Sequence, residues 1–257
     1  MLTFVGLGLY DERSVTVRGA DAIAAADRCF VEWYTSRLAG TDVATLEATH
    51  DVDIEVRDRA GVEQDPGPIL DAAAAGEAVF LAGGDPMIST THVDLRLRAI
   101  DRGIDTRVVH GTTAQTAASS LTGLQNYRFG KATTLPFEGS HGGTGVPESV
   151  LGTIAENQER DLHTLVYLDI DRRREAYMTG AEAGAQLTEA GLDGIGVVVD
   201  RAGSDDPTVA ADRLSALAEG SVGPPLHLLV LPGSLHALEA EALRKLGGAP
   251  TDLLPDR

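Results

Sequence analysis

Cysteine, lysine and long apolar runs are scarce or missing in this 257-residue chain. Its single cysteine, Cys29, excludes a disulfide within the chain and a zinc site built from several cysteines. No stretch of about 18 consecutive apolar residues occurs, and no basic lead precedes an apolar N-terminal segment. The sequence therefore predicts neither a membrane span nor a secretion signal, and the reducing cytoplasm is the expected location.

Basic residues are few, and nearly all of them are arginine. The chain has 39 Asp and Glu against 21 Lys and Arg, which gives a formal net charge of -18. The densest basic cluster is the short run Arg172, Arg173 and Arg174. A nucleic-acid partner is not expected, because phosphate binding needs a basic surface. Excess carboxylate with only two lysines, Lys131 and Lys245, favours a halophilic protein over a merely acidic cytosolic one.

Two nucleotide-binding fingerprints are incomplete. Gly6 and Gly8 follow the first apolar run, but Asp11 stands where a dinucleotide-binding loop has its third glycine, and its carboxylate would repel a diphosphate. Gly130 and Lys131 lack the hydroxyl residue and the upstream glycine of a P-loop. Nicotinamide, flavin and ATP chemistry are therefore not indicated.

No metal site is predicted either. The seven histidines do not follow the spacing of metal ligands. Asp169 and Asp171 come at the end of a strand, where they would suit a cation or, more commonly, cap a turn.

Apolar runs that alternate with helical patterns predict an α/β protein with parallel sheets and crossover helices. A break near 111–113 divides it into an N-terminal domain, 1–111, and a C-terminal domain, 112–257. One expected helix interleaves Val93, Leu95, Leu97 and Ile100 with charged residues. The expected strands are Thr3 to Leu9, Cys29 to Tyr34, Ile54 to Val56, Ala78 to Leu81, Thr106 to His110, Ala132 to Phe137, Thr164 to Ile170, Ile195 to Val199 and Leu226 to Leu231.

Two glycine-rich segments stand out besides the first. The run 138–147 is too rich in glycine for regular structure, and is either a mobile substrate loop or a surface turn. The other, Gly83-Gly84-Asp85-Pro86, leaves a buried strand at its carboxyl end, where ligands collect in α/β sheets. Together with Gly6 to Leu9 it is expected to form one backbone surface for a small polar ligand.

The order of these motifs resembles the tetrapyrrole-methylase superfamily of S-adenosylmethionine-dependent methyltransferases and, within it, the diphthine synthase family. The resemblance extends over nearly the whole chain. The matching blocks are Gly6 to Arg13, Glu32 to Ser36, Gly84 to Pro86, Ser89 to His92, Thr122 to Leu124, Phe129 to Lys131, Leu162 to Leu165, Leu168 to Ile170, Tyr177 to Thr179, Arg201 to Ser204 and Pro224 to His227.

The resemblance implies two α/β domains with the cofactor, S-adenosylmethionine, in the cleft between them. It also implies eight contacts with that cofactor. The first domain would supply Leu9, Asp85 and Ile88, the junction Thr113 and Ala114, and the second domain Leu168, Ala202 and His227.

The implied substrate is translation elongation factor 2, on a histidine that carries an aminocarboxypropyl group whose amine becomes methylated, to a trimethylammonium in archaea. The resemblance also suggests a homodimer. Asp169, Glu32 and His92 are conceivable proton acceptors, but no pattern selects one, and no catalytic residue is assigned. The alternatives are a sister methylase acting on a corrin or on ribosomal RNA, and a non-catalytic protein that binds S-adenosylmethionine.

Overall fold

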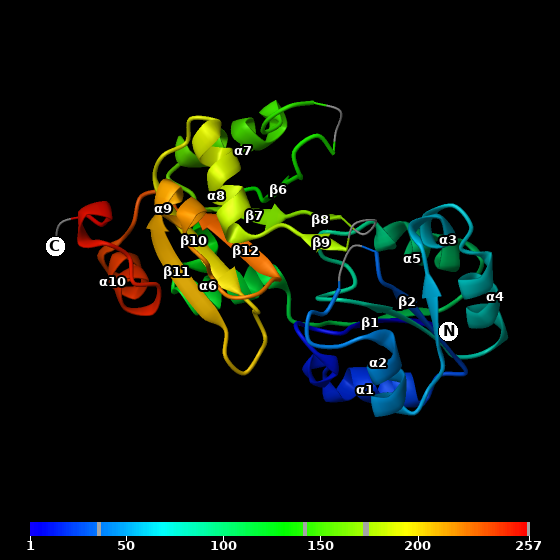
Figure 1. Ribbon diagram of the computed structural model, residues 1–257. Coiled ribbons are helices and arrows are strands. Elements are labelled where there is room, and N and C mark those ends of the chain that lie inside the picture. The colour runs from blue at the N-terminus through cyan, green and yellow to red at the C-terminus, as the bar shows by residue number, and fades with distance from the viewer. Residues whose placement is uncertain (35–36, 141–142, 172–174, 256–257) are drawn as a thin grey trace. The chain divides into compact units, whose positions relative to one another are not determined.

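The computed structural model describes residues 1–34, 37–140, 143–171 and 175–255. It divides into two compact units, Met1–Thr113 and Ala114–Arg257 (Figure 1). The α/β class predicted from the sequence is confirmed in both units. Several residues discussed above lie outside the described part of the chain. They are Thr35, Ser36, His141, Gly142, Arg172, Arg173 and Arg174.

Unit 1 is built on a parallel five-stranded sheet with the order β3-β2-β4-β1-β5. Its central strands β1 and β4 are buried along their whole length, as expected for a sheet covered on both faces. The strands are β1 (Leu2–Gly6), β2 (Arg28–Glu32), β3 (Ile54–Arg57), β4 (Ala78–Ala82) and β5 (Thr106–Val109).

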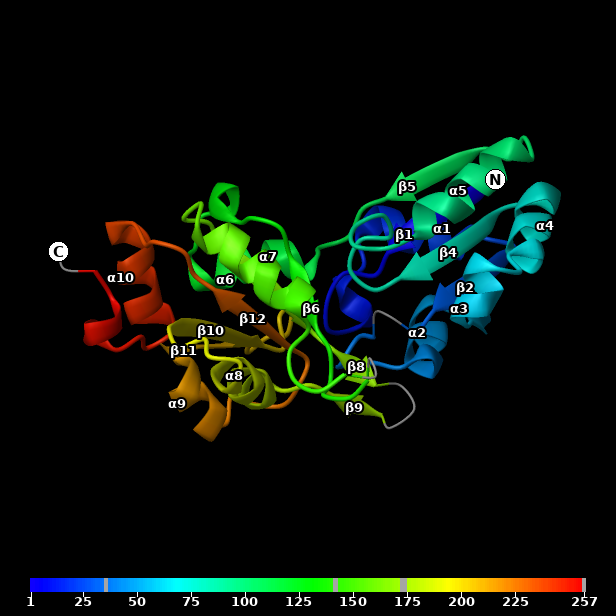
Figure 2. The same cartoon turned by 90° about the horizontal axis from the view of Figure 1, so that it is seen from above.

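Helices cover both faces of this sheet (Figure 2). On one face Phe4, Phe30 and Phe80 pack against Leu70 and Leu95. On the other face the alternate strand residues pack against the remaining helices, because successive side chains of a strand point to opposite sides. The helices are α1 (Val17–Ala24), α2 (Val43–His50), α3 (Arg59–Glu63), α4 (Gly67–Ala75) and α5 (His92–Asp101), with a 3-10 turn, η1 (Glu12–Ser14).

Helix α5 differs from its expected apolar face. Of the four apolar residues singled out in the sequence, only Leu95 is buried, whereas Val93, Leu97 and Ile100 are about half exposed. His92 and Ala99 complete the buried side instead. The side of α5 that faces the core includes a polar residue, His92. The spacing of the apolar residues alone therefore predicted the wrong face.

Unit 2 contains a mixed five-stranded sheet with the order β11-β10-β12-β7-β6. A parallel sheet was expected here, and that expectation is wrong: only β6 and β7 run parallel, and the other three pairs are antiparallel. The edge strand β11 was not predicted, because its polar sequence lacks an apolar run. The strands are β6 (Thr133–Leu135), β7 (Thr164–Leu168), β10 (Ile195–Asp200), β11 (Thr208–Arg213) and β12 (His227–Leu231).

Two apolar clusters fill the faces of this sheet, one against Ile154 and Leu187 and the other against Ala118 and Leu243. The described parts of the segment 138–147 contain neither helix nor strand, as predicted. The remaining elements are α6 (Ala114–Thr122), α7 (Glu148–Gln158), α8 (Gly180–Glu189), α9 (Leu214–Glu219), α10 (Ala237–Leu246), the hairpin strands β8 (Ile170–Asp171) and β9 (Ala176–Tyr177), and the 3-10 turns η2 (Asn126–Arg128) and η3 (Thr251–Leu253).

A buried carboxylate, Glu239, ties α10 to the rest of unit 2. Each of its oxygens accepts two hydrogen bonds. Oε1 accepts hydrogen bonds from the backbone N–H of Gln125 and from the ring Nε2–H of His163, both at 2.9 Å. Oε2 receives the Arg128 guanidinium at 2.7 Å and the backbone N–H of His236 at 3.0 Å. Burial alone would raise the pKa of Glu239, but these donors outweigh it and lower the pKa to about 2.

Candidate functional site

The two glycine loops of unit 1 are joined to each other through their backbones. Gly8 donates to the Gly84 carbonyl at 3.2 Å, and Gly84 donates back to the Gly8 carbonyl at 2.7 Å. Both residues have positive φ, 72° and 69°, a conformation that glycine adopts without a steric penalty. The structure therefore brings together the segments that follow β1 and β4, as the sequence predicted.

A third segment, which follows β5, packs against the same two loops. A Cβ atom on Gly111 would lie 2.2 Å from the Gly84 carbonyl oxygen and 3.0 Å from the Gly6 Cα. A Cβ on Gly6 would lie 2.5 Å from that oxygen. Neither position has room for a side chain, so glycine at both positions is what allows the three strand ends to approach.

Asp85 links these segments through its buried carboxylate. Oδ1 accepts the backbone N–H of Met87 at 2.9 Å. Oδ2 accepts the ring N–H of His110 at 2.8 Å and the backbone N–H of Gly111 at 3.3 Å. Asp85 was expected to contact the cofactor directly. In the structure its first role is to hold the β4 and β5 segments together, although each carboxylate oxygen keeps further acceptor capacity.

The other expected contacts of unit 1 border these loops. Leu9 is half-buried, and its carbonyl accepts the Ser14 hydroxyl. Ile88 exposes 47% of its surface next to the Asp85 turn, which leaves an apolar side chain available to a ligand. Thr113 and Ala114, both half-buried, follow β5 at the unit boundary. Leu9, Ile88 and Thr113 thus belong to the same carboxyl edge of the parallel sheet, whereas Ala114 is the first residue of α6 in unit 2.

Leu168, Ala202 and His227 meet at one edge of the unit 2 sheet. His227 begins β12 and pairs with Asp200, the last residue of β10. Ala202 follows in the turn after β10, where Arg201 donates its backbone N–H to the Leu226 carbonyl at 3.0 Å. Leu168 ends β7, which lies antiparallel beside β12. The three residues are far apart in sequence, and the antiparallel pairing brings them together.

His227 carries a buried donor without a partner. The backbone N–H of Gly180 donates to its Nδ1 at 2.8 Å, so Nδ1 is the unprotonated nitrogen of a neutral ring. Burial lowers the pKa of His227 and favours this neutral form, while the nearby Pro224 and Gly223 carbonyls oppose the shift. The other nitrogen, Nε2, then carries the hydrogen, and it has no hydrogen-bond partner among the described residues. A buried unpaired donor is costly, and a ligand acceptor would satisfy it.

The three conceivable proton acceptors have structural partners. Asp169 caps a turn, because its two carboxylate oxygens accept the backbone N–H groups of Ile170 and Phe137 at 2.9 and 3.1 Å. Glu32 is fully buried in unit 1 and accepts the backbone N–H of Tyr34. His92 is also buried, and its Nδ1 donates to the Pro86 carbonyl at 3.0 Å. None of the three is thereby marked as a catalytic base.

Burial lowers the pKa of His92, while the neighbouring Glu32 carboxylate opposes that shift. The ring is consequently neutral at pH 7.

Within the described ranges, no group of three or more histidine, cysteine, aspartate or glutamate residues has the arrangement of a metal site. No helix in the described part of the chain is long and apolar enough to cross a membrane.

Sequence reasoning missed three residues of these edges. His110 and Gly111 anchor Asp85, and Gly180 fixes the ring of His227. A histidine and a glycine directly after a predicted strand were a usable signal for the first two. Gly180 lies 47 residues from its partner in the chain, and nothing local connects them.

Comparison with known proteins places the chain in a family. A model of the tetrapyrrole (corrin/porphyrin) methylases matches residues 1–218. The chain belongs to the tetrapyrrole methylases. This tetrapyrrole methylase is 65% identical to a diphthine synthase of Natronomonas pharaonis, over 100% of this chain and 99% of the relative. It is 69% identical to a diphthine synthase of Halobacterium salinarum, over 99% and 100% of the two chains.

Solved structures agree with these relatives. A crystal structure of diphthine synthase superposes on this tetrapyrrole methylase with a TM-score of 0.90 at 36% identity, covering 98% of each chain. A putative diphthine synthase from Entamoeba histolytica gives a TM-score of 0.83 at 31% identity, over 97% of this chain and 99% of the other.

Proposed function

We propose that this protein is an S-adenosylmethionine-dependent methyltransferase that methylates the amine of an aminocarboxypropyl-histidine in elongation factor 2, forming diphthine in diphthamide biosynthesis. One observation carries the proposal: curated diphthine synthases are 65% and 69% identical to this chain over essentially its whole length. We propose that the reaction takes place in the cytoplasm and that the amine is fully trimethylated.

We place the cofactor contacts at the two strand edges described above. In the division of the chain into domains 1–111 and 112–257, Leu9, Asp85 and Ile88 serve in the first domain and Leu168, Ala202 and His227 in the second. Thr113 and Ala114 serve at the junction. Two features support a fit to S-adenosylmethionine. Backbone groups crowd together where glycine replaces side chains, and His227 presents a buried N–H that needs an acceptor.

When bound, S-adenosylmethionine supplies a methyl group on a sulfonium, a good leaving group for in-line transfer to an amine. The protein's part is mainly to position, and such positioning is worth effective molarities of about 10⁵ M or more. The fixed Gly8–Gly84 bridge and the Asp85 anchor give unit 1 a rigid edge for this purpose. The amine must lose a proton before each transfer, and we assign no residue to that step.

Other substrates are less well supported. An RNA substrate conflicts with a net charge of -18, because RNA binding relies on basic surface. The curated relatives named above are diphthine synthases, which favours elongation factor 2 as substrate over a corrin and over a non-catalytic role.

Intact-peptide mass spectrometry of elongation factor 2 tests the reaction. The factor, carrying the aminocarboxypropyl histidine, is incubated with the protein and S-adenosylmethionine in concentrated potassium chloride. Mass gains in methyl steps on that histidine are expected, and none without the cofactor. No gain, although calorimetry shows that the cofactor binds, would reject this substrate and leave the cofactor assignment standing.

Calorimetry of His227→Asn tests the cofactor edge of unit 2. The Asn side-chain carbonyl can still accept the Gly180 N–H, while the Nε2 donor is lost. We expect S-adenosylmethionine to bind roughly tenfold more weakly, from the loss of one buried hydrogen bond, with little change in melting temperature. Unchanged affinity would show that Nε2 does not serve the cofactor.

We further propose a homodimer. The exposed apolar row Val93, Leu97 and Ile100 on α5 supports a surface that packs against another protein. Light scattering after size exclusion is expected to give twice the 26.9 kDa chain mass; a monomer at micromolar concentration would reject this.

A further inference from the structure

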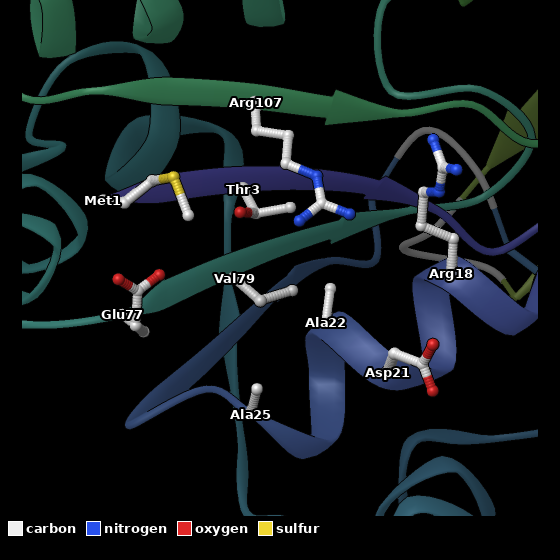
Figure 3. Close-up of a pocket in the computed structure, with 9 residues that line it drawn as sticks. All are labelled: Met1, Thr3, Arg18, Asp21, Ala22, Ala25, Glu77, Val79 and Arg107. Atoms are coloured by element: carbon white, nitrogen blue, oxygen red, sulfur yellow. The ribbon is translucent and has the colours of Figure 1, made fainter.

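A pocket of about 440 Å³ lies in unit 1, away from the glycine loops. It opens between α1 and the amino-terminal halves of three strands (Figure 3). Its volume is within the range of small-molecule sites. The residues around it are Met1, Thr3, Arg18, Asp21, Ala22, Ala25, Glu77, Val79 and Arg107.

The pocket exists because small residues of α1 face the sheet. Thr3 of β1 pairs in register with Val79 of β4 and with Arg107 of β5, so the three side chains form a row on one face. Ala22 and Ala25 line the pocket from α1, and their methyl groups leave the space above the row unfilled. The floor therefore has Thr3 at its centre, with the apolar Val79 on one side and Arg107 on the other.

Four charged side chains border this floor, and they stay apart from one another. Arg18, Arg107, Asp21 and Glu77 all line the pocket, yet none forms an ion pair with any residue that the structure describes. Arg28 and Arg102 of the same unit are paired with Glu55 and Asp71, whereas the charges around the pocket stay available to a ligand.

Thr3 adds a buried polar group. Only 3% of its surface is exposed, and its hydroxyl has no hydrogen-bond partner in the described ranges. Figure 3 shows it in the part of the pocket that the Arg107 side chain enters. Because Thr3 lines the pocket, its hydroxyl can donate a hydrogen bond to an acceptor on a ligand there.

We propose that this pocket binds a small zwitterion of the amino-acid type. Its carboxylate would meet Arg107 and the Thr3 hydroxyl, its ammonium would meet Glu77, and its side chain would lie on Val79 and the alanines. Guanidinium and carboxylate groups suit these two partners by charge and by hydrogen-bond capacity. The proposal is independent of the methyltransferase function.

Three fluorinated probes with the same aromatic body separate the charges. They are 4-fluoro-phenylalanine, with both charges, 3-(4-fluorophenyl)propionate, with the carboxylate alone, and 4-fluorophenethylamine, with the ammonium alone. ¹⁹F NMR titration of the full chain, at one fixed salt concentration, measures each affinity. We expect the zwitterion to bind roughly tenfold more tightly than either of the two probes with a single charge, because each charge makes its own charge-assisted contact.

Variants locate the binding. Arg107→Gln should weaken binding of the zwitterion roughly tenfold and bring its affinity near that of the amine. Thr3→Val should also weaken binding of the zwitterion. Glu77→Gln should bring its affinity near that of the propionate. Arg160→Gln is the matched control, because Arg160 is exposed in unit 2 and should leave all three affinities unchanged.

Three results would overturn the proposal. The first is a ¹⁹F line of the zwitterion that the protein does not broaden at millimolar probe concentration. The second is equal affinity of all three probes for the wild type. The third is an equal loss of zwitterion affinity in Arg107→Gln and Arg160→Gln. Thr3→Val alters no charge, so it keeps the test decisive if Arg107→Gln folds poorly.

Discussion

The two units hold their strand edges by different means. In unit 1, backbone meets backbone: Gly6 and Gly111 approach the Gly84 carbonyl oxygen within distances that exclude a Cβ, and one carboxylate, Asp85, fastens the loops. In unit 2, buried side chains carry the contacts: His227 fixes one loop, and Glu239 gathers four donors. A backbone contact needs glycine at each position, whereas a side-chain network needs each of its partners in the right charge state.

This difference decides how each unit should fail. Added bulk should damage unit 1, and changes of charge or protonation should damage unit 2. The following variants either break this contrast or sharpen it.

The largest effect is expected from Glu239→Ala. It leaves the Arg128 guanidinium buried without its carboxylate, which typically costs about 3–5 kcal/mol. Urea unfolding followed by circular dichroism measures the loss. Glu241→Ala is the control on the same helix, since its ion pairs with Arg244 and Lys245 lie at the surface and their loss should change stability far less. Similar losses in both variants would contradict the role of burial.

The stability of the protein should also depend on the protonation of Glu239. Its pKa falls from 4.5 to about 2 in the folded state. Its contribution is therefore complete above about pH 4.5 and is lost as the pH falls toward 2. In Glu239→Gln the slope of stability against pH in this window should be shallower than in the wild type. Parallel slopes would mean that the carboxylate is not held as described.

Gly111→Ala should have the next largest effect. Its Cβ would meet the Gly84 carbonyl oxygen at 2.2 Å, and overpacking of this kind costs about 1–3 kcal/mol. Because the loops must separate, S-adenosylmethionine affinity should fall with it, which calorimetry measures. Gly152→Ala in α7 is the control, since its Cβ meets nothing within 4 Å and alanine favours a helix. Undiminished cofactor affinity in Gly111→Ala would break the account of unit 1.

The smallest effect is a dependence on salt. The chain has a net charge of -18, and it should repel an acidic protein substrate in dilute buffer. We expect the methylation rate to rise from dilute to concentrated potassium chloride, measured with labelled methyl groups. A rate that is greatest in dilute buffer would count against a halophilic protein.

Much of unit 1 was predictable from the sequence, and less of unit 2. Buried parallel strands such as β1 and β4 are continuous apolar runs, and the glycines that follow them are visible in the sequence. Alternation of strands and helices does not specify strand direction, so the antiparallel pairs of unit 2 were missed. Strand β11 is an edge with few apolar residues and carried no signal.

The candidate site also has a part that the sequence could predict and a part that it could not. The eight expected contacts came from family resemblance and stay a prediction; seven of the residues lie at two strand edges, and Ala114 begins α6. The partners of those contacts were not predictable: His110 meets Asp85 across 25 residues, and Gly180 meets His227 across 47. Such pairs depend on the tertiary fold, which no local pattern encodes.

The central claim is that both strand edges hold S-adenosylmethionine. Hydrogen exchange of the full chain, with and without the cofactor and read by mass spectrometry, tests it most directly. The account predicts slower exchange in the peptides that contain 6–9, 83–88 and 110–114, and also in those that contain 201–202 and 226–228. Protection confined to one unit, or found at the Arg107 pocket instead, would contradict it.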